Sequence, residues 1–129
     1  MSGFLLDTNA VLFALAAPEK LSGEARAAIM TGPNQLSVVS YWEVLLKSMK
    51  GKLEVGDPRT WWADALDQLA AVPLYLRPDH FAAVYPLPLH HQDPFARVLV
   101  AQAIVEDLTL ITSDAEIALY AEAGLRIVA

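Results

Sequence analysis

A short apolar segment near the start of the chain ends abruptly at a carboxylate. Residues 3–6 form this segment, Asp7 follows it directly, and residues 8–16 carry a helix-forming pattern. A brief apolar run of this kind, bounded by a change of pattern, is typical of a buried strand. In open α/β sheets, ligands bind at the carboxyl ends of the strands. The segment therefore favours a sheet covered by helices, and it makes Asp7 the first candidate for a functional site.

The rest of the chain alternates between helix-like and strand-like segments. We expect further strands at residues 35–39, 72–76, 108–112 and 126–128. We expect further helices at residues 24–30, 40–49, 58–69, 78–84, 94–105 and 114–120. Alternation of this kind predicts a parallel sheet covered on both faces. We therefore predict an α/β fold for residues 1–129: a single three-layer domain with a central parallel sheet of four to five strands and helices on both faces.

Composition narrows the class of protein. The 129 residues are 55% hydrophobic and 19% charged, which is enough for one folded domain with a real core. No apolar run approaches the roughly 18 residues of a membrane span, and the N-terminus lacks a secretory pattern. The chain has no cysteine, which excludes thiolate metal sites. We expect a cytoplasmic protein without membrane contact.

The net charge of −6 argues against nucleic-acid binding through a broad basic face. It suits a protein that gathers carboxylates around a metal ion, or one with a basic partner. Such a protein can still cut RNA if a metal ion contacts the phosphate.

Three later acids, Glu43, Asp93 and Asp114, stand near the starts of predicted helices. Each has a structural alternative, as Asp7 does, because Asp is a good N-cap and Ser40 with Glu43 matches a capping box. Several carboxylates in one cleft repel each other unless a cation compensates them. Carboxylate oxygens select Mg²⁺ or Mn²⁺ over softer metals. We therefore predict that a hard divalent cation is held at one sheet edge by Asp7, Glu43, Asp93 and Asp114.

Other polar residues lie close to these acids in the sequence. Those expected to support the cation or contact the substrate are Thr8, Asn9, Arg97, Thr112 and Ser113. Arg97 would either pair with an acid or neutralise a phosphate. His90 and His91 lack zinc spacing, so we expect solvated loop residues or weak substrate contacts, and we expect His80 at the surface.

With these segments in view, the sequence resembles the PIN-domain family, and within it the VapC-like toxins of toxin–antitoxin operons. The matching motifs are LLDTN at 5–9, SYWEV at 40–44 with Lys47, HHQDPFAR at 90–97, VAQA at 100–103 and LITSD at 110–114. The resemblance implies a metal-dependent endoribonuclease that uses Mg²⁺ or Mn²⁺. It also implies a homodimer and a small antitoxin partner, with a DNA-binding segment, that blocks the site.

The resemblance matches Asp7, Glu43 and Asp114 to the first, second and fourth acids of the family. Relatives usually read Asp-Pro-Phe-Asp-Arg in the third motif, and the second Asp of that run is the third acid. This chain has Ala96 there, and Asp93 lies three residues earlier, nearly one helical turn away. Either Asp93 serves instead, directly or through water, or the site is weakened, whether naturally or by an engineered change.

Two other functions are weighed against the nuclease. In the first, Ala96 leaves a catalytically poor binding module that acts through a partner, with Trp61 and Trp62 on its apolar surface. In the second, Asp7 is a phosphoacceptor, but a dehalogenase-type site requires a second Asp where Asn9 stands. We therefore favour hydrolysis of RNA phosphodiester bonds.

Overall fold

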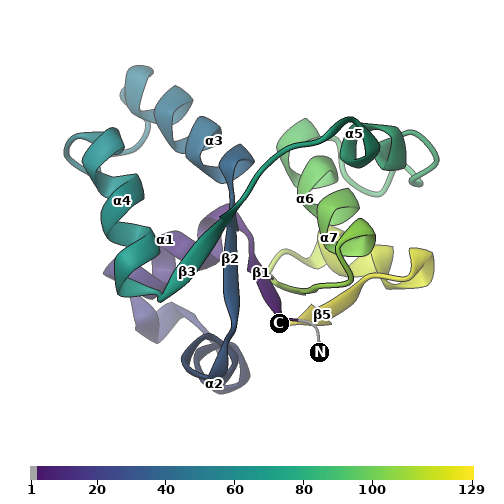
Figure 1. The fold of residues 1–129 in the computed structure, drawn as a ribbon, viewed down its shortest axis with the longest axis horizontal. Coiled ribbons are helices and arrows are strands. Elements are labelled where there is room, and N and C mark those ends of the chain that lie inside the picture. Colours follow the sequence, from purple (N-terminus) through teal and green to yellow (C-terminus); the bar gives the residue numbers. More distant parts are fainter. Residues whose placement is uncertain (1–2) are drawn as a thin grey trace.

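A parallel sheet lies at the centre of the fold (Figure 1). The computed structural model describes residues 3–129. In that range the strands are β1 (Phe4–Leu6), β2 (Asn34–Ser37), β3 (Ala71–Leu74), β4 (Thr109–Ile111) and β5 (Arg126–Val128), in the order β3-β2-β1-β4-β5. All neighbouring strands run parallel, so the predicted α/β architecture is confirmed. Because β1 is the middle strand, its carboxyl end lies at the centre of one sheet edge.

Helices cover both faces of this sheet. They are α1 (Thr8–Ala16), α2 (Gly23–Thr31), α3 (Val38–Met49), α4 (Pro58–Gln68), α5 (Pro78–Val84), α6 (Pro94–Val105) and α7 (Ala115–Ala118), with the short 3-10 helices η1 (Pro18–Lys20) and η2 (Leu119–Ala123). Figure 1 shows α6 and α7 on one side of the sheet, and α1, α2 and α4 on the other. No helix within residues 3–129 has both the length and the apolar character to cross a membrane.

Two hydrophobic cores follow from the alternation of side chains along β1. Leu5 packs with residues of α6 and α7, including Val100 and Ile117. Leu6 packs on the opposite face with residues of α1, α2 and α4, including Val11. Successive strand residues point to opposite faces, so one short apolar strand belongs to both cores. Both of these leucines are fully buried.

The boundary between β2 and α3 differs from the prediction. β2 ends at Ser37, whose Oγ accepts a hydrogen bond from the Val39 backbone N–H at 3.0 Å and so caps α3. The predicted strand over residues 35–39 is therefore too long, because Val38 and Val39 carry strand-like β-branched side chains inside a helix. The predicted capping box is also wrong, since Ser40 lies within α3 and Glu43 on its second turn.

Helix α6 forms the buried layer next to β4. Asp93 caps it and Pro94 opens it, as the sequence predicts. Its buried residues include Ala96, Leu99 and Gln102, which confirms a helix buried on most sides. The helix predicted at residues 114–120 is shorter: α7 covers one turn and tightens into η2 before Gly124, at φ 97°, ends it.

Candidate metal centre

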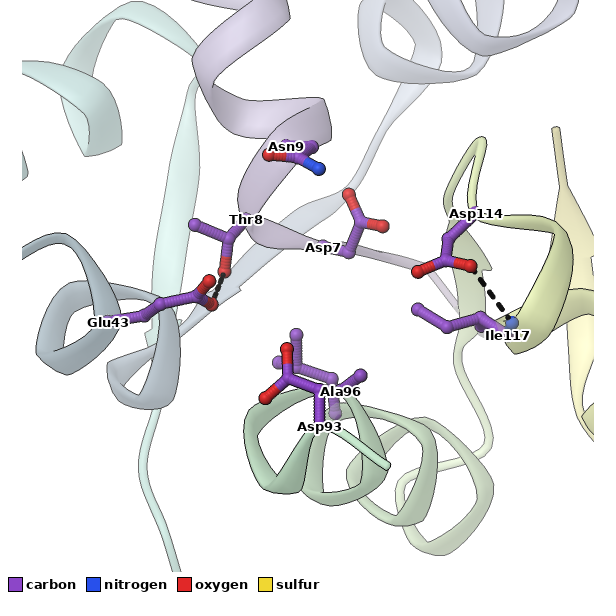
Figure 2. A pocket seen from close by; sticks show the side chains of 9 residues that line it. Asp7, Thr8, Asn9, Glu43, Asp93, Ala96, Asp114 and Ile117 are labelled. Atoms are coloured by element: carbon purple, nitrogen blue, oxygen red, sulfur yellow. Dashed lines mark hydrogen bonds between the residues drawn. The ribbon is translucent and has the colours of Figure 1, made fainter. Parts of the chain in front are cut away.

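Four acids from four different elements line one pocket at the carboxyl edge of the sheet (Figure 2). Asp7 lies between β1 and α1, Glu43 on α3, Asp93 at the start of α6, and Asp114 at the start of α7. The pocket has a volume of about 50 Å³, room for little more than a small hydrated ion. Its other lining residues are Thr8, Asn9, Ala96, Leu99 and Ile117. The predicted convergence of acids that are distant in sequence is present in the structure.

The three aspartates also cap helices, which was the structural alternative to a metal site in the sequence analysis. Asp7 Oδ1 accepts the Ala10 N–H at 2.7 Å, and Asp93 Oδ1 accepts the Phe95 N–H at 3.0 Å. Asp114 Oδ1 accepts the Glu116 N–H at 2.8 Å. Each cap uses one carboxylate oxygen, so the second oxygen is held in a defined direction. In this structure, capping a helix and facing the pocket are therefore compatible roles of the same side chain.

Asp7 is the most deeply buried of the four acids, with only 6% of its surface exposed. Burial raises the pKa of its carboxyl group, because the charged form loses hydration. Hydrogen bonds from Thr112 and from the Ala10 backbone oppose this, while the charges of Asp114 and Glu43 raise the pKa further. Without a cation, the ionised Asp7 is therefore destabilised by its surroundings.

Both oxygens of Glu43 are engaged by neighbouring side chains. Thr8 Oγ1 donates to Oε1 at 2.8 Å, and Lys47 Nζ lies 2.8 Å from Oε2, one helical turn along α3. Thr8 Oγ1 also lies 2.9 Å from the Ser40 Oγ, so the hydroxyl is held from two sides. Glu43 thus enters the pocket with a fixed orientation and with a nearby ammonium group that reduces the local negative charge.

Asp114 is more exposed and more heavily hydrogen-bonded than Asp7. Burial acts to raise the pKa of its carboxyl group, but the hydrogen bond from His91 and those from backbone N–H groups outweigh it, and the net shift is downward. The Thr112 hydroxyl accepts the Asp114 backbone N–H at 3.0 Å and also hydrogen-bonds the Asp7 carboxylate. Thr112 therefore connects the first and fourth acids, as expected of a residue that supports the site.

Of the other residues predicted to support the site, one lines the pocket and two do not. Asn9 is exposed at the pocket, whereas Ser113 is exposed and is not among the residues that line it. Arg97 does not pair with an acid in the described structure, contrary to one prediction, and its donors are used elsewhere. Its guanidinium donates to the backbone carbonyls of residues 84, 87 and 88 and to the Tyr120 hydroxyl. It therefore fixes the loop before α6, which leaves little capacity for a phosphate.

Two histidines lie in environments that the sequence did not predict. His80, expected at the surface, is fully buried, and its Nε2 lies 2.7 Å from Glu106 Oε2. His91, expected as a solvated loop residue or a weak substrate contact, has its Nε2 2.8 Å from Asp114 Oδ2. Ligand atoms of His91, Asp114 and Glu116 all lie within 4.8 Å of one another. The polar run of residues 90–92 before the Asp93 cap contains no sequence signal that distinguishes a histidine paired with an acid from an ordinary loop histidine.

The donor set of the pocket fits a hard divalent cation. Its ionisable groups are carboxylates, whose oxygens are the usual ligands of Mg²⁺ and Mn²⁺, and one of them is buried with a raised pKa. Ala96 occupies the wall between Asp93 and Leu99 with a methyl group, so α6 supplies one carboxylate from its cap and none from its first turn. The lining therefore has the oxygen donors that such an ion prefers.

Residues 4–123 match the PIN-domain family. The chain is a PIN domain. Its fold is similar to that of a chain in the VapBC2 complex of Rickettsia felis bound to a promoter DNA fragment, with a TM-score of 0.66, 12% identity and coverage of 97% of this chain and 96% of that chain. It is also similar to a chain of FitAcB from Neisseria gonorrhoeae, with a TM-score of 0.64, 18% identity and coverage of 98% and 96%.

A third similar structure is a toxin–antitoxin complex from Klebsiella pneumoniae, with a TM-score of 0.55, 21% identity and coverage of 85% of both chains. No curated protein matches the sequence of this PIN domain. At these identities the structural matches establish a shared fold. The family membership places the acid-lined pocket in a class of proteins that are generally nucleases.

Proposed function

We propose that this PIN domain is a metal-dependent endoribonuclease and the toxin of a toxin–antitoxin pair. The observation that carries the proposal is the convergence of four acids, from four separate elements, on one small pocket around a buried aspartate. Family membership supports a nuclease, and the similar chains come from toxin–antitoxin complexes. The cation would be Mg²⁺ or Mn²⁺, held by Asp7, Asp93 and Asp114, with Glu43 beside it.

A bound divalent cation supplies a Lewis acid for the scissile phosphate and lowers the pKa of an attacking water. Asp7, buried at the centre, provides the charge that attracts the ion into the pocket. Glu43, fixed by Thr8 and Lys47, orients the water or binds a second ion. Asn9 lies exposed at the pocket, where its amide can contact the RNA strand. No side chain forms a covalent intermediate in this scheme.

An RNA-cleavage assay with Mg²⁺ or Mn²⁺ tests the proposal. We predict that Asp7→Asn lowers cleavage roughly 100-fold or more, since even residues that support a metal ligand are worth about 10–100-fold. The matched control is Asp67→Asn, which removes an exposed aspartate of α4 with the same change in charge. Unchanged cleavage by Asp7→Asn, or cleavage that persists in excess chelator, would contradict the assignment.

The toxin role also requires partners, and we propose a small antitoxin with a DNA-binding segment, a homodimer and a cytoplasmic location. The surface supports protein partners, because two grooves have largely apolar walls. One, of about 430 Å³, lies among α3, α5 and α6 and includes the half-exposed Trp42 and Phe81. The other, of about 530 Å³, lies between α1 and α4 beside Trp61. Exposed apolar surface of this kind is typical of interaction sites.

Co-purification with the product of the adjacent reading frame tests the antitoxin. We expect a small protein with a basic start that binds this chain and suppresses cleavage. Light scattering on the isolated chain tests the dimer, since a homodimer has twice the 14.0 kDa of one chain. A monomeric chain that does not bind the product of the adjacent reading frame would contradict the proposed partners.

A second function is favoured by one observation: Ala96 lines the pocket at the position where the sequence motif of the PIN-domain family usually has an acid. The chain would then be a PIN-fold binding module with a weakened site. Ala96→Asp separates the two functions. If the native chain is inactive and the substitution restores metal-dependent cleavage, the binding module is the better account; if the native chain cleaves RNA, Asp93 suffices.

A further inference from the structure

One imidazole connects two of the four acids. His91 Nε2 lies 2.8 Å from Asp114 Oδ2, and His91 Nδ1 accepts the Asp93 backbone N–H at 3.0 Å. Asp93 and Asp114 belong to different elements, the start of α6 and the turn after β4. His91 therefore links the Asp114 carboxylate to the backbone of Asp93, across two elements that are distant in sequence.

The hydrogen bonds fix the tautomer of this ring. A backbone N–H can only donate, so His91 Nδ1 must offer its lone pair to Asp93, and the ring proton lies on Nε2. Nε2 then donates its proton to the Asp114 carboxylate. To bind a metal ion through Nε2, the ring would have to move its proton to Nδ1 and lose the Asp93 contact. Although its ligand atoms lie near those of Asp114 and Glu116, His91 is thus arranged to orient an acid.

The backbone of His91 is anchored to the protein interior. Its N–H donates to the Tyr120 hydroxyl at 3.1 Å, and Tyr120 is fully buried. The same hydroxyl accepts a hydrogen bond from Arg97 at 2.9 Å, and Arg97 in turn donates to the carbonyls of the last residue of α5 and of two residues in the loop that follows it. His91 is therefore held by the buried Tyr120 of η2, which Arg97 of α6 contacts in turn.

We propose that His91 is a positioning residue that holds Asp93 and Asp114 in register for cation binding, and that it does not itself ligate the ion. The inference rests on the proposed function of the pocket. Ala96 gives a structural reason for this role of His91. Because α6 has no acid on its first turn, the only acid that it brings to the pocket is its cap residue, Asp93, which then needs support from outside the helix. His91 provides that support from two residues away.

Mn²⁺ titrations followed by electron paramagnetic resonance test this role. We expect His91→Ala to weaken Mn²⁺ binding about 10–100-fold, as the loss of a supporting residue usually does. His91→Gln should recover most of the affinity, because its amide keeps one donor for Asp114 and one acceptor for the Asp93 N–H. Added imidazole should partly restore His91→Ala. The control is His90→Ala, which removes the adjacent histidine with its contacts to Glu122 and to the Tyr120 ring, but none of the hydrogen bonds of the His91 ring, and should leave Mn²⁺ affinity unchanged.

Each outcome decides for or against the inference. Equal Mn²⁺ affinity in the native protein and in a folded His91→Ala variant would overturn it, whether or not RNA is cut. Directly coordinated nitrogen in the Mn²⁺ spectrum would also overturn it, because His91 would then be a ligand. Should His91→Ala not fold, ¹⁵N spectra of the native imidazole decide: a proton on Nε2 supports the role, and a proton on Nδ1 contradicts it. Mn²⁺ binding by the native chain without RNA cleavage would contradict the proposed nuclease alone.

Discussion

Single residues in this PIN domain combine roles that sequence analysis treats as alternatives. Asp7, Asp93 and Asp114 each cap a helix with one carboxylate oxygen and line the pocket at the same time. A cap fixes the side-chain torsion angles, so it also aims the remaining oxygen. From the sequence, the helix cap and the metal-site acid are two alternative roles for each aspartate. In the structure, each aspartate has both positions at once.

Asp7→Asn should stabilise the protein when divalent cations are removed by a chelator. The substitution keeps an oxygen for the Ala10 N–H and removes a buried charge that Glu43 and Asp114 repel. We expect the midpoint of thermal unfolding to rise by about 2–4 °C, equivalent to roughly 1 kcal/mol. Added Mn²⁺ should then stabilise the native chain but not the variant. Destabilisation of the chelated protein by Asp7→Asn would contradict the burial argument.

The same residue predicts a direction for the pH dependence of stability. The pKa of Asp7 is raised on folding, so between its unfolded and folded pKa values the native state binds more protons than the unfolded state. The Asp7 contribution to the free energy of unfolding therefore falls as the pH rises through that window. Urea unfolding in chelator, from acid to neutral pH, should show that Asp7→Asn is more stabilising at neutral pH than near the unfolded pKa. A gain that is independent of pH would contradict the prediction.

At the scale of elements, helix starts decide where the acids lie. Ser37 ends β2 and caps α3, and its Oγ also donates to Gln102 Oε1 of α6 at 2.5 Å. Had Ser40 been the cap, Glu43 would bond the backbone of its own helix start. With the actual cap three residues earlier, Glu43 lies on the second turn and reaches Thr8.

Ser37→Ala should lower the free energy of unfolding by about 1–3 kcal/mol. The change removes a helix cap and leaves a buried Gln102 oxygen without its donor. The matched control is Ser22→Ala, which removes the cap of α2 in a more exposed setting and should cost about 1 kcal/mol or less. Denaturant unfolding measures both values, and equal costs would show that the contact with α6 contributes little.

Arg97→Lys should destabilise the loop between α5 and α6. The guanidinium reaches three carbonyls and the Tyr120 hydroxyl at once, which a lysine cannot do. We expect a loss of about 1–2 kcal/mol and faster proteolysis at residues 85–92. Arg59→Lys is the control, because Arg59 pairs only with the exposed Asp57 in the described structure and should change stability by less than about 0.5 kcal/mol. Similar effects of the two substitutions would contradict this role of Arg97.

Elements differ in how far the sequence predicts them. α1 and α6 follow from largely apolar segments with clear boundary signals, Pro18 after α1 and Asp93-Pro94 at the start of α6, and their predicted bounds agree with the structure. The start of α3 was misplaced because local propensity favours a strand at Val38 and Val39, whereas the cap is set by contacts with α6. The burial of His80 and the pairing of His91 depend on Glu106 and Asp114, which lie more than twenty residues away in sequence.

At the scale of the whole molecule, the strand order brings the site together. The order β3-β2-β1-β4-β5 places the end of β1 between those of β2 and β4, so Asp7 meets acids that follow both neighbours. Alternating helices and strands predict a parallel sheet, but they leave the strand order open. The acids themselves were predicted from the sequence, whereas their spacing and supports required the structure.

An anomalous difference map from crystals grown with Mn²⁺ would test the central claim most directly. The account predicts one Mn²⁺ peak in the pocket, within about 2.2 Å of oxygens from Asp7 and Asp114, with Glu43 and Asp93 beside it and no nitrogen ligand from His91. A peak elsewhere on the molecule, or the four carboxylates directed away from a common ion, would contradict it.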